Sequence, residues 1–248
     1  MSAGTDSQAG PLDQRVVLVS GAHGGLGSVA AMACARAGAT VVLLGRRVPR
    51  LNRLYDAIAV EGPEPLLYPL DLEGASPDDY AELGKRLETE LGRLDGVLHC
   101  AAEFRGLTPL LQTDPAAFAR AIHVNLTARW WLSQACLPLL AKAEDPALVF
   151  VVDDRARVGK ANWGGYGIAQ HGLATLVGML HAELANTPVR VAGLQPGPMR
   201  TALRAMAYVE EDDRSARPPE TYAQACVTLL SAAGVDHRGQ VWAPGDDA

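Results

Sequence analysis

The chain has 248 residues, of which 48% are hydrophobic and 20% charged, and its formal net charge is −6. This composition is typical of one large globular domain or of two small ones. The acidic balance, with no basic block, argues against nucleic acid as a partner. No apolar run reaches the length of a membrane span, so a membrane partner is not expected either.

The N-terminal residues 1–11 are small and polar and lack the apolar core of a signal peptide, so they predict a flexible tail. Residues 12–248 are expected to form a single domain in the cytoplasm. Cysteines lie far apart in apolar segments and form no Cys-x-x-Cys pair: Cys34, Cys100, Cys136 and Cys226. We therefore expect buried reduced thiols and no metal site.

The chain is organised around a glycine-rich turn near its start. Four apolar residues, Val16 to Val19, predict a buried strand, and the run from Leu26 to Ala37 predicts a helix. Gly21, Gly25 and Gly27 lie between them in a G-x-x-x-G-x-G pattern. Glycines allow a tight turn and a close approach of the backbone to a pyrophosphate, which the amides at the helix start attract. The pattern indicates a dinucleotide site.

Apolar runs and helical stretches alternate along the rest of the chain. The expected strands are 40–44, 65–70, 94–100, 147–152, 189–194 and 240–242. The expected helices are 50–60, 77–91 with Ser76 as N-cap, 115–140 after Asp114, 163–185, a short one near 202, and 219–232. This alternation predicts an α/β fold with a doubly wound parallel sheet of about seven strands and helices on both faces.

The longest irregular segment is 196–218, which carries the charge run Glu210 to Arg214. It is interpreted as a solvated loop or as a mobile lid, and it would line the substrate pocket. The residues that line the substrate pocket lie in this variable loop, so the sequence does not identify the small-molecule substrate.

Five motifs, in order, resemble the short-chain dehydrogenase/reductase family over essentially the whole chain. They are Ser20 to Gly27 as the cofactor loop, Asp71 after the third strand, Asn125, Tyr166, and Pro196 to Thr201. The segment from Gly159 to Tyr166 is also similar to a bacterial branch of uncharacterised oxidoreductases. The resemblance implies a Rossmann fold in which the catalytic positions are Asn125, Asp153, Tyr166 and Gln170. It implies a cofactor site along Gly21, His23, Gly25, Leu26, Gly27, Arg46, Arg47, Asp71, Leu72, Cys100, Ala101, Ala102, Tyr166, Gln170, Pro196, Gly197, Met199 and Thr201.

The chain departs from the family at two catalytic positions. Asp153 stands where the family has serine, and Gln170 stands where it has lysine four residues after the tyrosine. The lysine charge lowers the pKa of the tyrosine, which is ordinarily about 10, and glutamine supplies no charge. An ionised Asp153 would repel a developing alkoxide by about 4 kcal/mol at 4 Å with an effective dielectric near 20. The usual mechanism is therefore expected to be impaired, unless Asp153 is protonated or Lys160, Arg157 or His171 replaces the missing base.

Arg46 and Arg47 directly follow the second strand, where an acidic residue would bind the 2′-hydroxyl of NAD. A guanidinium suits a 2′-phosphate, so NADP is the expected cofactor rather than NAD.

Three functions stay open at this point. The first is an NADP-dependent oxidoreductase acting on a carbonyl or alcohol, with Tyr166 as acid. The second is a cofactor-binding sensor or partner subunit without turnover. The third is a non-redox reaction with Asp153 as base. In proteins that this chain resembles, the two long apolar helices, 115–140 and 163–185 here, pair across a two-fold axis, so the resemblance implies a homo-oligomer, either dimer or tetramer.

Overall fold

The computed structural model describes residues 9–208 and 215–245. Its centre is a sheet of seven parallel strands in the order β3-β2-β1-β4-β5-β6-β7. The strands are β1 (Val16–Ser20), β2 (Thr40–Gly45), β3 (Leu66–Pro69), β4 (Gly96–His99), β5 (Ala147–Val151), β6 (Arg190–Leu194) and β7 (Val241–Trp242). This confirms the predicted doubly wound α/β fold. The strand order reverses between β1 and β4, which is where ligands bind in such sheets.

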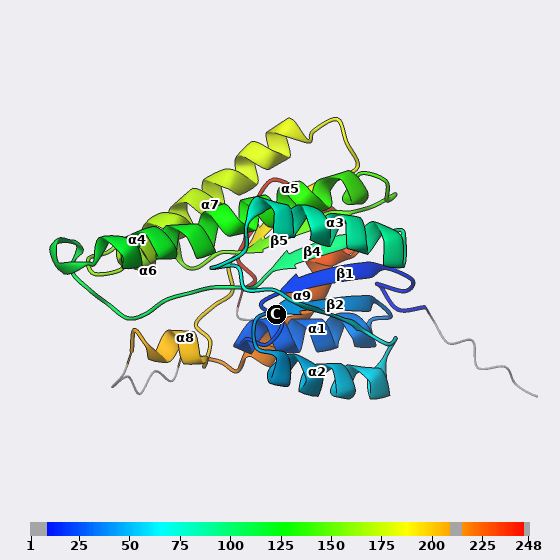
Figure 1. Ribbon diagram of the computed structural model, residues 1–248, viewed down its shortest axis with the longest axis horizontal. Coiled ribbons are helices and arrows are strands. Elements are labelled where there is room, and N and C mark those ends of the chain that lie inside the picture. The colour runs from blue at the N-terminus through cyan, green and yellow to red at the C-terminus, as the bar shows by residue number, and fades with distance from the viewer. Residues whose placement is uncertain (1–8, 209–214, 246–248) are drawn as a thin grey trace, which may run out of the picture.

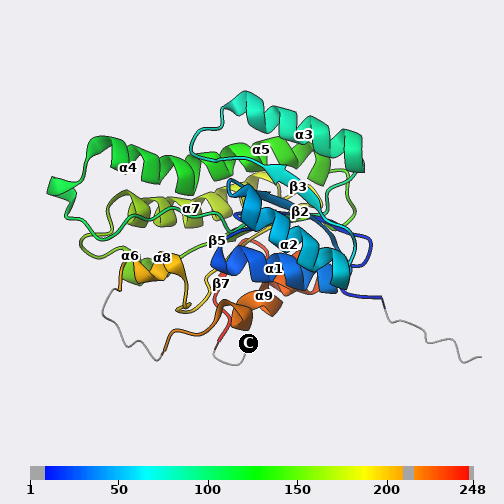
Figure 2. The ribbon, with the colours of Figure 1, turned by 60° about the horizontal axis from the view of Figure 1, so that its bottom comes forward.

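Helices cover both faces of the sheet (Figure 1). One layer holds α1 (Gly25–Arg36), α2 (Val48–Glu61) and α9 (Ala223–Leu230), as Figure 2 shows. The other holds α3 (Pro77–Leu91), α4 (Pro115–Ile122), α5 (Ala128–Leu140) and α7 (Gly164–Glu183). Two short helices, α6 (Arg155–Val158) and α8 (Ala202–Ala205), lie near the carboxyl ends of the strands. None of the described helices is long and apolar enough to cross a membrane.

Alternate residues of each strand build two separate cores, because successive side chains point to opposite faces. In β1, Val17 and Val19 pack with α1, α2 and α9, whereas Val16 and Leu18 pack with α3, α5 and α7. All five residues of β1 are buried. Burial on both faces explains why this strand is continuously apolar in sequence.

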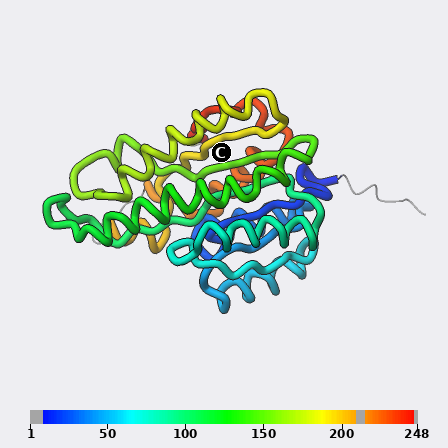
Figure 3. The backbone as a smooth tube through the Cα atoms, turned by 45° about the horizontal axis from the view of Figure 1, so that its top comes forward, coloured from blue at the N-terminus to red at the C-terminus, as the bar shows by residue number. Residues whose placement is uncertain are grey.

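The predicted helix 115–140 is wrong in one respect, because it is not continuous. A π-helical turn, His123–Thr127, separates α4 from α5. The chain trace nevertheless runs on in one direction through this turn (Figure 3). The π-turn brings Asn125 to the inside, where its side chain is fully buried. Such turns occur often at functional sites.

Other expected boundaries need smaller corrections. The predicted helix 219–232 is a 3₁₀ turn (Pro219–Tyr222), then α9, then a second 3₁₀ turn (Ala232–His237), because the backbone is extended at Ser231. Helix α6 was not expected. Cys34, Cys136 and Cys226 are free and buried, as predicted, but Cys100 is only half-buried. Residues 1–8 of the predicted tail and the whole charge run from Glu210 to Arg214 lie outside the described residues.

Candidate active site

The glycine turn between β1 and α1 is built as the sequence predicts. Gly21 has a φ of +68°, and a Cβ there would lie 2.5 Å from Cα of Ala101. A side chain at Gly27 would overlap the backbone of Gly21. Helix α1 begins after Gly24 with no side-chain cap, so its first amides have no side-chain acceptor. Free amides at a helix start, close to a glycine-lined turn, fit a pyrophosphate.

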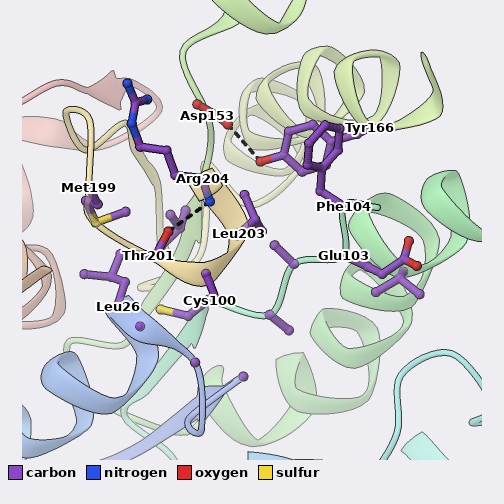
Figure 4. Close-up of a pocket in the computed structure, with 18 of the residues that line it drawn as sticks. Leu26, Cys100, Glu103, Phe104, Asp153, Tyr166, Met199, Thr201, Leu203 and Arg204 are labelled. Carbon is purple, nitrogen blue, oxygen red and sulfur yellow. Dashed lines mark hydrogen bonds between the residues drawn. The ribbon is translucent and has the colours of Figure 1, made fainter. Parts of the chain in front are cut away.

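A cavity of about 380 Å³ opens beside this turn, at the carboxyl ends of the strands (Figure 4). Its wall contains nearly all the residues predicted for the site: Gly21, His23, Gly25, Leu26, Arg46, Arg47, Asp71, Leu72, Cys100, Ala101, Ala102, Asp153, Tyr166, Gln170, Pro196, Gly197, Met199 and Thr201. Two predicted residues, Gly27 and Asn125, do not line it. Gly27 packs against the backbone of Gly21, and Asn125 bonds to the backbone of Glu103 and Ala121.

One end of the cavity is rich in arginine. Arg46, Arg47 and Arg50 line it together with His23. Burial lowers the pKa of His23, and the charges of Arg47, Arg46 and Arg50 lower it further. Nδ1 of His23 has no hydrogen-bond partner in the described part of the chain. An imidazole held neutral among three guanidiniums fits the recognition of a phosphate. A place for Arg50 in the cavity wall was not predicted, because an arginine in a helix is ordinarily expected on the surface.

Acidic side chains also lie close to this end. Nη1 of Arg46 is 3.6 Å from Oδ2 of Asp71 and 3.7 Å from Oε2 of Glu73. These distances are too long for hydrogen bonds, and the Arg46 side chain is 40% exposed. Such an exposed pair is weak, so Arg46 is free to turn toward an anion.

The other end of the cavity holds Tyr166 on α7. Its hydroxyl donates a 2.9 Å hydrogen bond to Oδ2 of Asp153 (Figure 4). Oδ1 of Asp153 accepts from the guanidinium of Arg157 and from the amide of Asp154 at 2.7 Å. Three donors on two oxygens fit an ionised carboxylate rather than a protonated one.

Burial raises the pKa of Tyr166 well above its usual value. The charge of Asp153 and its hydrogen bond raise this pKa further, whereas the charges of Arg129 and Arg157 lower it. The phenol is consequently neutral at physiological pH.

Gln170 takes the place of the family lysine and bonds to the backbone of Asp153. Its Oε1 accepts a 3.0 Å hydrogen bond from the amide of Asp153. The side chain is buried and fixes the backbone that carries the carboxylate. Of the replacement bases considered above, Arg157 contacts Asp153, whereas Lys160 and His171 do not line the cavity.

Asn125 holds two segments together from the π-turn. Its Nδ2 donates to the carbonyl oxygens of Ala121 and Glu103, each at 2.8 Å. Its Oδ1 accepts from the amide of Glu103 at 3.0 Å. Asn125 therefore fixes the chain that follows β4, which forms one wall of the cavity.

An aromatic wall lies next to Tyr166 and was missed in the sequence. Phe104 and Trp163 stack with their ring centroids 5.1 Å apart, and Phe104 lies 5.1 Å from the ring of Tyr166. Tyr208, which follows α8, also lines the cavity. These side chains give the substrate end an apolar character suited to a carbon skeleton.

The segment 196–208 forms the remaining wall. The amide of Arg200 donates to the carbonyl of Arg217 at 2.9 Å, so the two strands of the predicted loop 196–218 are joined near its start and its end. Thr201 caps α8 by accepting from the amide of Arg204. The predicted substrate loop thus closes on itself beside the cavity, with 209–214 outside the described residues.

Comparison with known proteins decides the family. A family profile described as short chain dehydrogenase matches residues 15–212. The chain belongs to the short chain dehydrogenase family. As an oxidoreductase of this family, it is 37% identical over 209 residues to the "Uncharacterized oxidoreductase YciK" of Escherichia coli K12, which covers 84% of this chain and 82% of that protein.

Solved structures of this family agree closely with the fold. A short chain dehydrogenase of Pseudomonas syringae is 39% identical, with a TM-score of 0.90 over 95% of this chain and 96% of the other. A short chain dehydrogenase of Escherichia coli CFT073 complexed with NADPH is 34% identical, with a TM-score of 0.90 over 95% and 98%.

Proposed function

We propose that the chain is an NADP(H)-dependent oxidoreductase that interconverts an alcohol and a carbonyl compound, with Asp153 as the terminal proton acceptor. The observation that carries the proposal is the hydrogen bond from the Tyr166 hydroxyl to Asp153, inside a cavity that also contains the glycine turn.

The cofactor assignment is supported by three features. The glycine turn leaves no room for side chains at Gly21, and α1 starts with uncapped amides. Three guanidiniums and a neutral His23 meet where the adenosine end would lie. A relative with a TM-score of 0.90 is complexed with NADPH. When bound, NADP supplies the hydride acceptor, and NADPH the hydride donor.

The chain's own residues account for the proton. In alcohol oxidation, the substrate hydroxyl gives its proton to the phenol oxygen of Tyr166 while Tyr166 passes its own proton to Oδ2 of Asp153. The carbinol carbon would lose hydride to NADP⁺ in the same reaction, so that the products would be a carbonyl compound, NADPH and a protonated Asp153. Carbonyl reduction follows the reverse path.

This path suits the environment of Tyr166 better than the usual one. A tyrosinate is disfavoured here, because burial and Asp153 both raise the pKa of Tyr166. In the proposed path Tyr166 gains a proton as it loses one, so it never becomes a full anion. Arg157 holds Asp153 in position and neutralises its charge before the reaction.

The second candidate is a cofactor-binding protein without turnover. It is favoured by one specific observation, that the Tyr166 hydroxyl is already engaged by Asp153. The two candidates differ in turnover and agree in cofactor binding.

The experiment therefore measures both properties. Calorimetric titration with NADPH and NADH tests binding, and a panel of alcohols, ketones, aldehydes and quinones tests turnover in the wild type and in Tyr166→Phe. We expect NADPH binding in both proteins and turnover in the wild type alone. Absence of NADPH binding refutes the assignment of the cofactor. Binding without turnover on the whole panel supports the second candidate.

We also propose that the chain forms a homo-oligomer through α5 and α7. Trp130, Ile168 and Met179 are large apolar side chains exposed on these two helices. Sedimentation of the wild type and of Ile168→Asp at micromolar concentration tests this: a wild-type monomer contradicts it, and dissociation of the variant supports it.

A further inference from the structure

A buried cation lies beneath the active site. Arg129, near the start of α5, is 1% exposed and is among the largest fully buried side chains. Its Nη1 donates to the carbonyl oxygen of Val151 at 2.9 Å, and its Nη2 donates to the carbonyl oxygen of Ala101. The guanidinium thus fills the gap between the carboxyl ends of β5 and β4, where it borders the cavity.

Within residues 9–208 and 215–245, no carboxylate pairs with this charge. Among the residues that the structure describes, none pairs with Arg129 as an ion pair, and its Nε has no hydrogen-bond partner there. A buried cation without a counter-ion is costly, so its retention calls for an explanation beyond packing. Burial lowers the pKa of Arg129 to about 10, so it remains charged at neutral pH.

The charges around Tyr166 show what Arg129 supplies. Asp153, Arg157 and Arg129 line the same cavity as the phenol, and Arg157 is paired with Asp153. One positive charge is left over, that of Arg129. The family site also has one unneutralised positive charge, the lysine that Gln170 replaces here.

We propose that Arg129 is the cation that takes over the electrostatic role of the family lysine, acting on Tyr166 from beneath the strand ends rather than from α7. It acts as a positioning residue through Tyr166, and the inference rests on the proposed role of Tyr166 in proton transfer. One of its two bonds also fixes Val151, two residues before Asp153.

The electrostatics agree with this geometry. The charge of Arg129 lowers the pKa of Tyr166, in opposition to burial and to Asp153. Conversely, Tyr166 and Cys100 raise the pKa of Arg129. His99, which is buried and neutral, has its pKa lowered first by burial and then by Arg129. An opposite charge at close range typically shifts a pKa by about 1 to 3 units.

The test measures the phenol directly, without a substrate. 3,5-Difluorotyrosine, which ionises well below tyrosine, is incorporated at position 166, and its ¹⁹F signal is followed against pH with and without NADPH. We expect Arg129→Met to raise the titration midpoint by about 1 unit or more. Arg129→Lys is expected to restore most of the difference, because it keeps the charge.

The matched control is Arg15→Met. Arg15 also donates to backbone carbonyls, those of Asp145 and Leu230, and its loss leaves Asp145 paired with Arg190. The residue it holds, Asp145, precedes β5, so the control lies at the opposite end of the sheet from Tyr166. This variant is expected to leave the midpoint unchanged.

An unchanged midpoint in folded Arg129→Met overturns the proposal. Where Arg129→Met does not fold, Arg129→Gln is judged by the same criterion. Failure of both to fold, while Arg129→Lys folds, means that the cation serves the fold and also overturns it. A shifted midpoint in a protein without turnover on the panel supports the second candidate function, and it leaves only the electrostatic action of Arg129 on Tyr166 standing.

Discussion

The hydroxyl of Tyr166 and the carboxylate of Asp153 are joined by a 2.9 Å hydrogen bond across the cavity, from α7 to the end of β5. Arg157, one helical turn after Asp153, pairs with the other carboxylate oxygen. Tyr166 and Arg157 thus both donate to the Asp153 carboxylate and hold it in place. This arrangement places a proton acceptor where the family has a serine donor, and it makes Asp153 the side chain on which the proposed chemistry depends.

Asp153→Asn is the first prediction. The amide has the same size but does not accept a proton, so we expect turnover to fall by about 100-fold or more, the usual contribution of general acid–base catalysis. NADPH affinity should be unchanged. Steady-state kinetics and calorimetry measure both quantities.

The matched control is Asp154→Asn. Asp154 caps α6 by accepting from the amides of Ala156 and Arg157, and asparagine is an equally good cap. Turnover of this variant should stay within about twofold of the wild type. Equal losses in the two variants would show a general effect of charge, not a role for Asp153.

Arg46→Ala is the second prediction. A lost hydrogen bond to a charged group costs about 1.5–3 kcal/mol, so we expect NADPH to bind at least about 10-fold more weakly. NADH, which has no 2′-phosphate, should bind as it does to the wild type. Calorimetric titration with both cofactors gives the comparison.

Arg53→Ala serves as the control for this prediction, since Arg53 is an exposed arginine on α2, the helix that follows Arg46, and its side chain bonds to the carbonyl of Pro49. It should change neither affinity. A wild type that binds NADH as tightly as NADPH would contradict the assignment of the 2′-phosphate to Arg46.

Much of the fold was predictable, because its signals are local. The buried strands are short apolar runs, and the caps at Ser76 and Asp114 lie where the sequence places them. The π-turn was not predictable, because the residues around Asn125 continue the helical pattern. Its reason is tertiary: the amide of Asn125 bonds to Glu103, 22 residues away.

The site was predictable in its wall and not in its electrostatics. The glycine turn and the motif residues line the cavity as expected, because motif spacing carries that information. The buried position of Arg129 was not predicted, because an arginine in a helix ordinarily lies on the surface. One signal was present: Arg129 is the only charged residue between Leu126 and Leu140.

Gly21→Ala is the third prediction. Gly21 has a φ of +68°, and a Cβ would lie 2.5 Å from the backbone of Ala101. The left-handed conformation alone costs about 1–2 kcal/mol, and the overlap adds to it. We expect the free energy of unfolding to fall by at least about 2 kcal/mol and NADPH binding to be lost. Chemical denaturation and calorimetry measure the two effects.

Gly74→Ala is its control, because a Cβ at Gly74 meets nothing within 4 Å. This variant should keep the wild-type stability within about 0.5 kcal/mol. A Gly21→Ala protein that is as stable as Gly74→Ala would contradict the tight packing of the turn against Ala101.

The fourth prediction concerns His99, which is fully buried on β4 and stacks on Phe150 with ring centroids 4.5 Å apart. Burial, and then the charge of Arg129, lower its pKa well below the usual 6.5. The unfolded chain therefore binds a proton below pH 6.5 that the folded chain does not, so acid favours unfolding.

We expect the free energy of unfolding of the wild type, relative to His99→Leu, to fall by up to about 1.4 kcal/mol per pH unit below pH 6.5. Urea denaturation of both proteins between pH 8 and pH 5 measures this difference, and other titrating groups cancel in it. Parallel slopes for wild type and His99→Leu would show that the folded protein binds a proton at His99 as readily as the unfolded chain does. Neither burial nor Arg129 would then lower the pKa of His99.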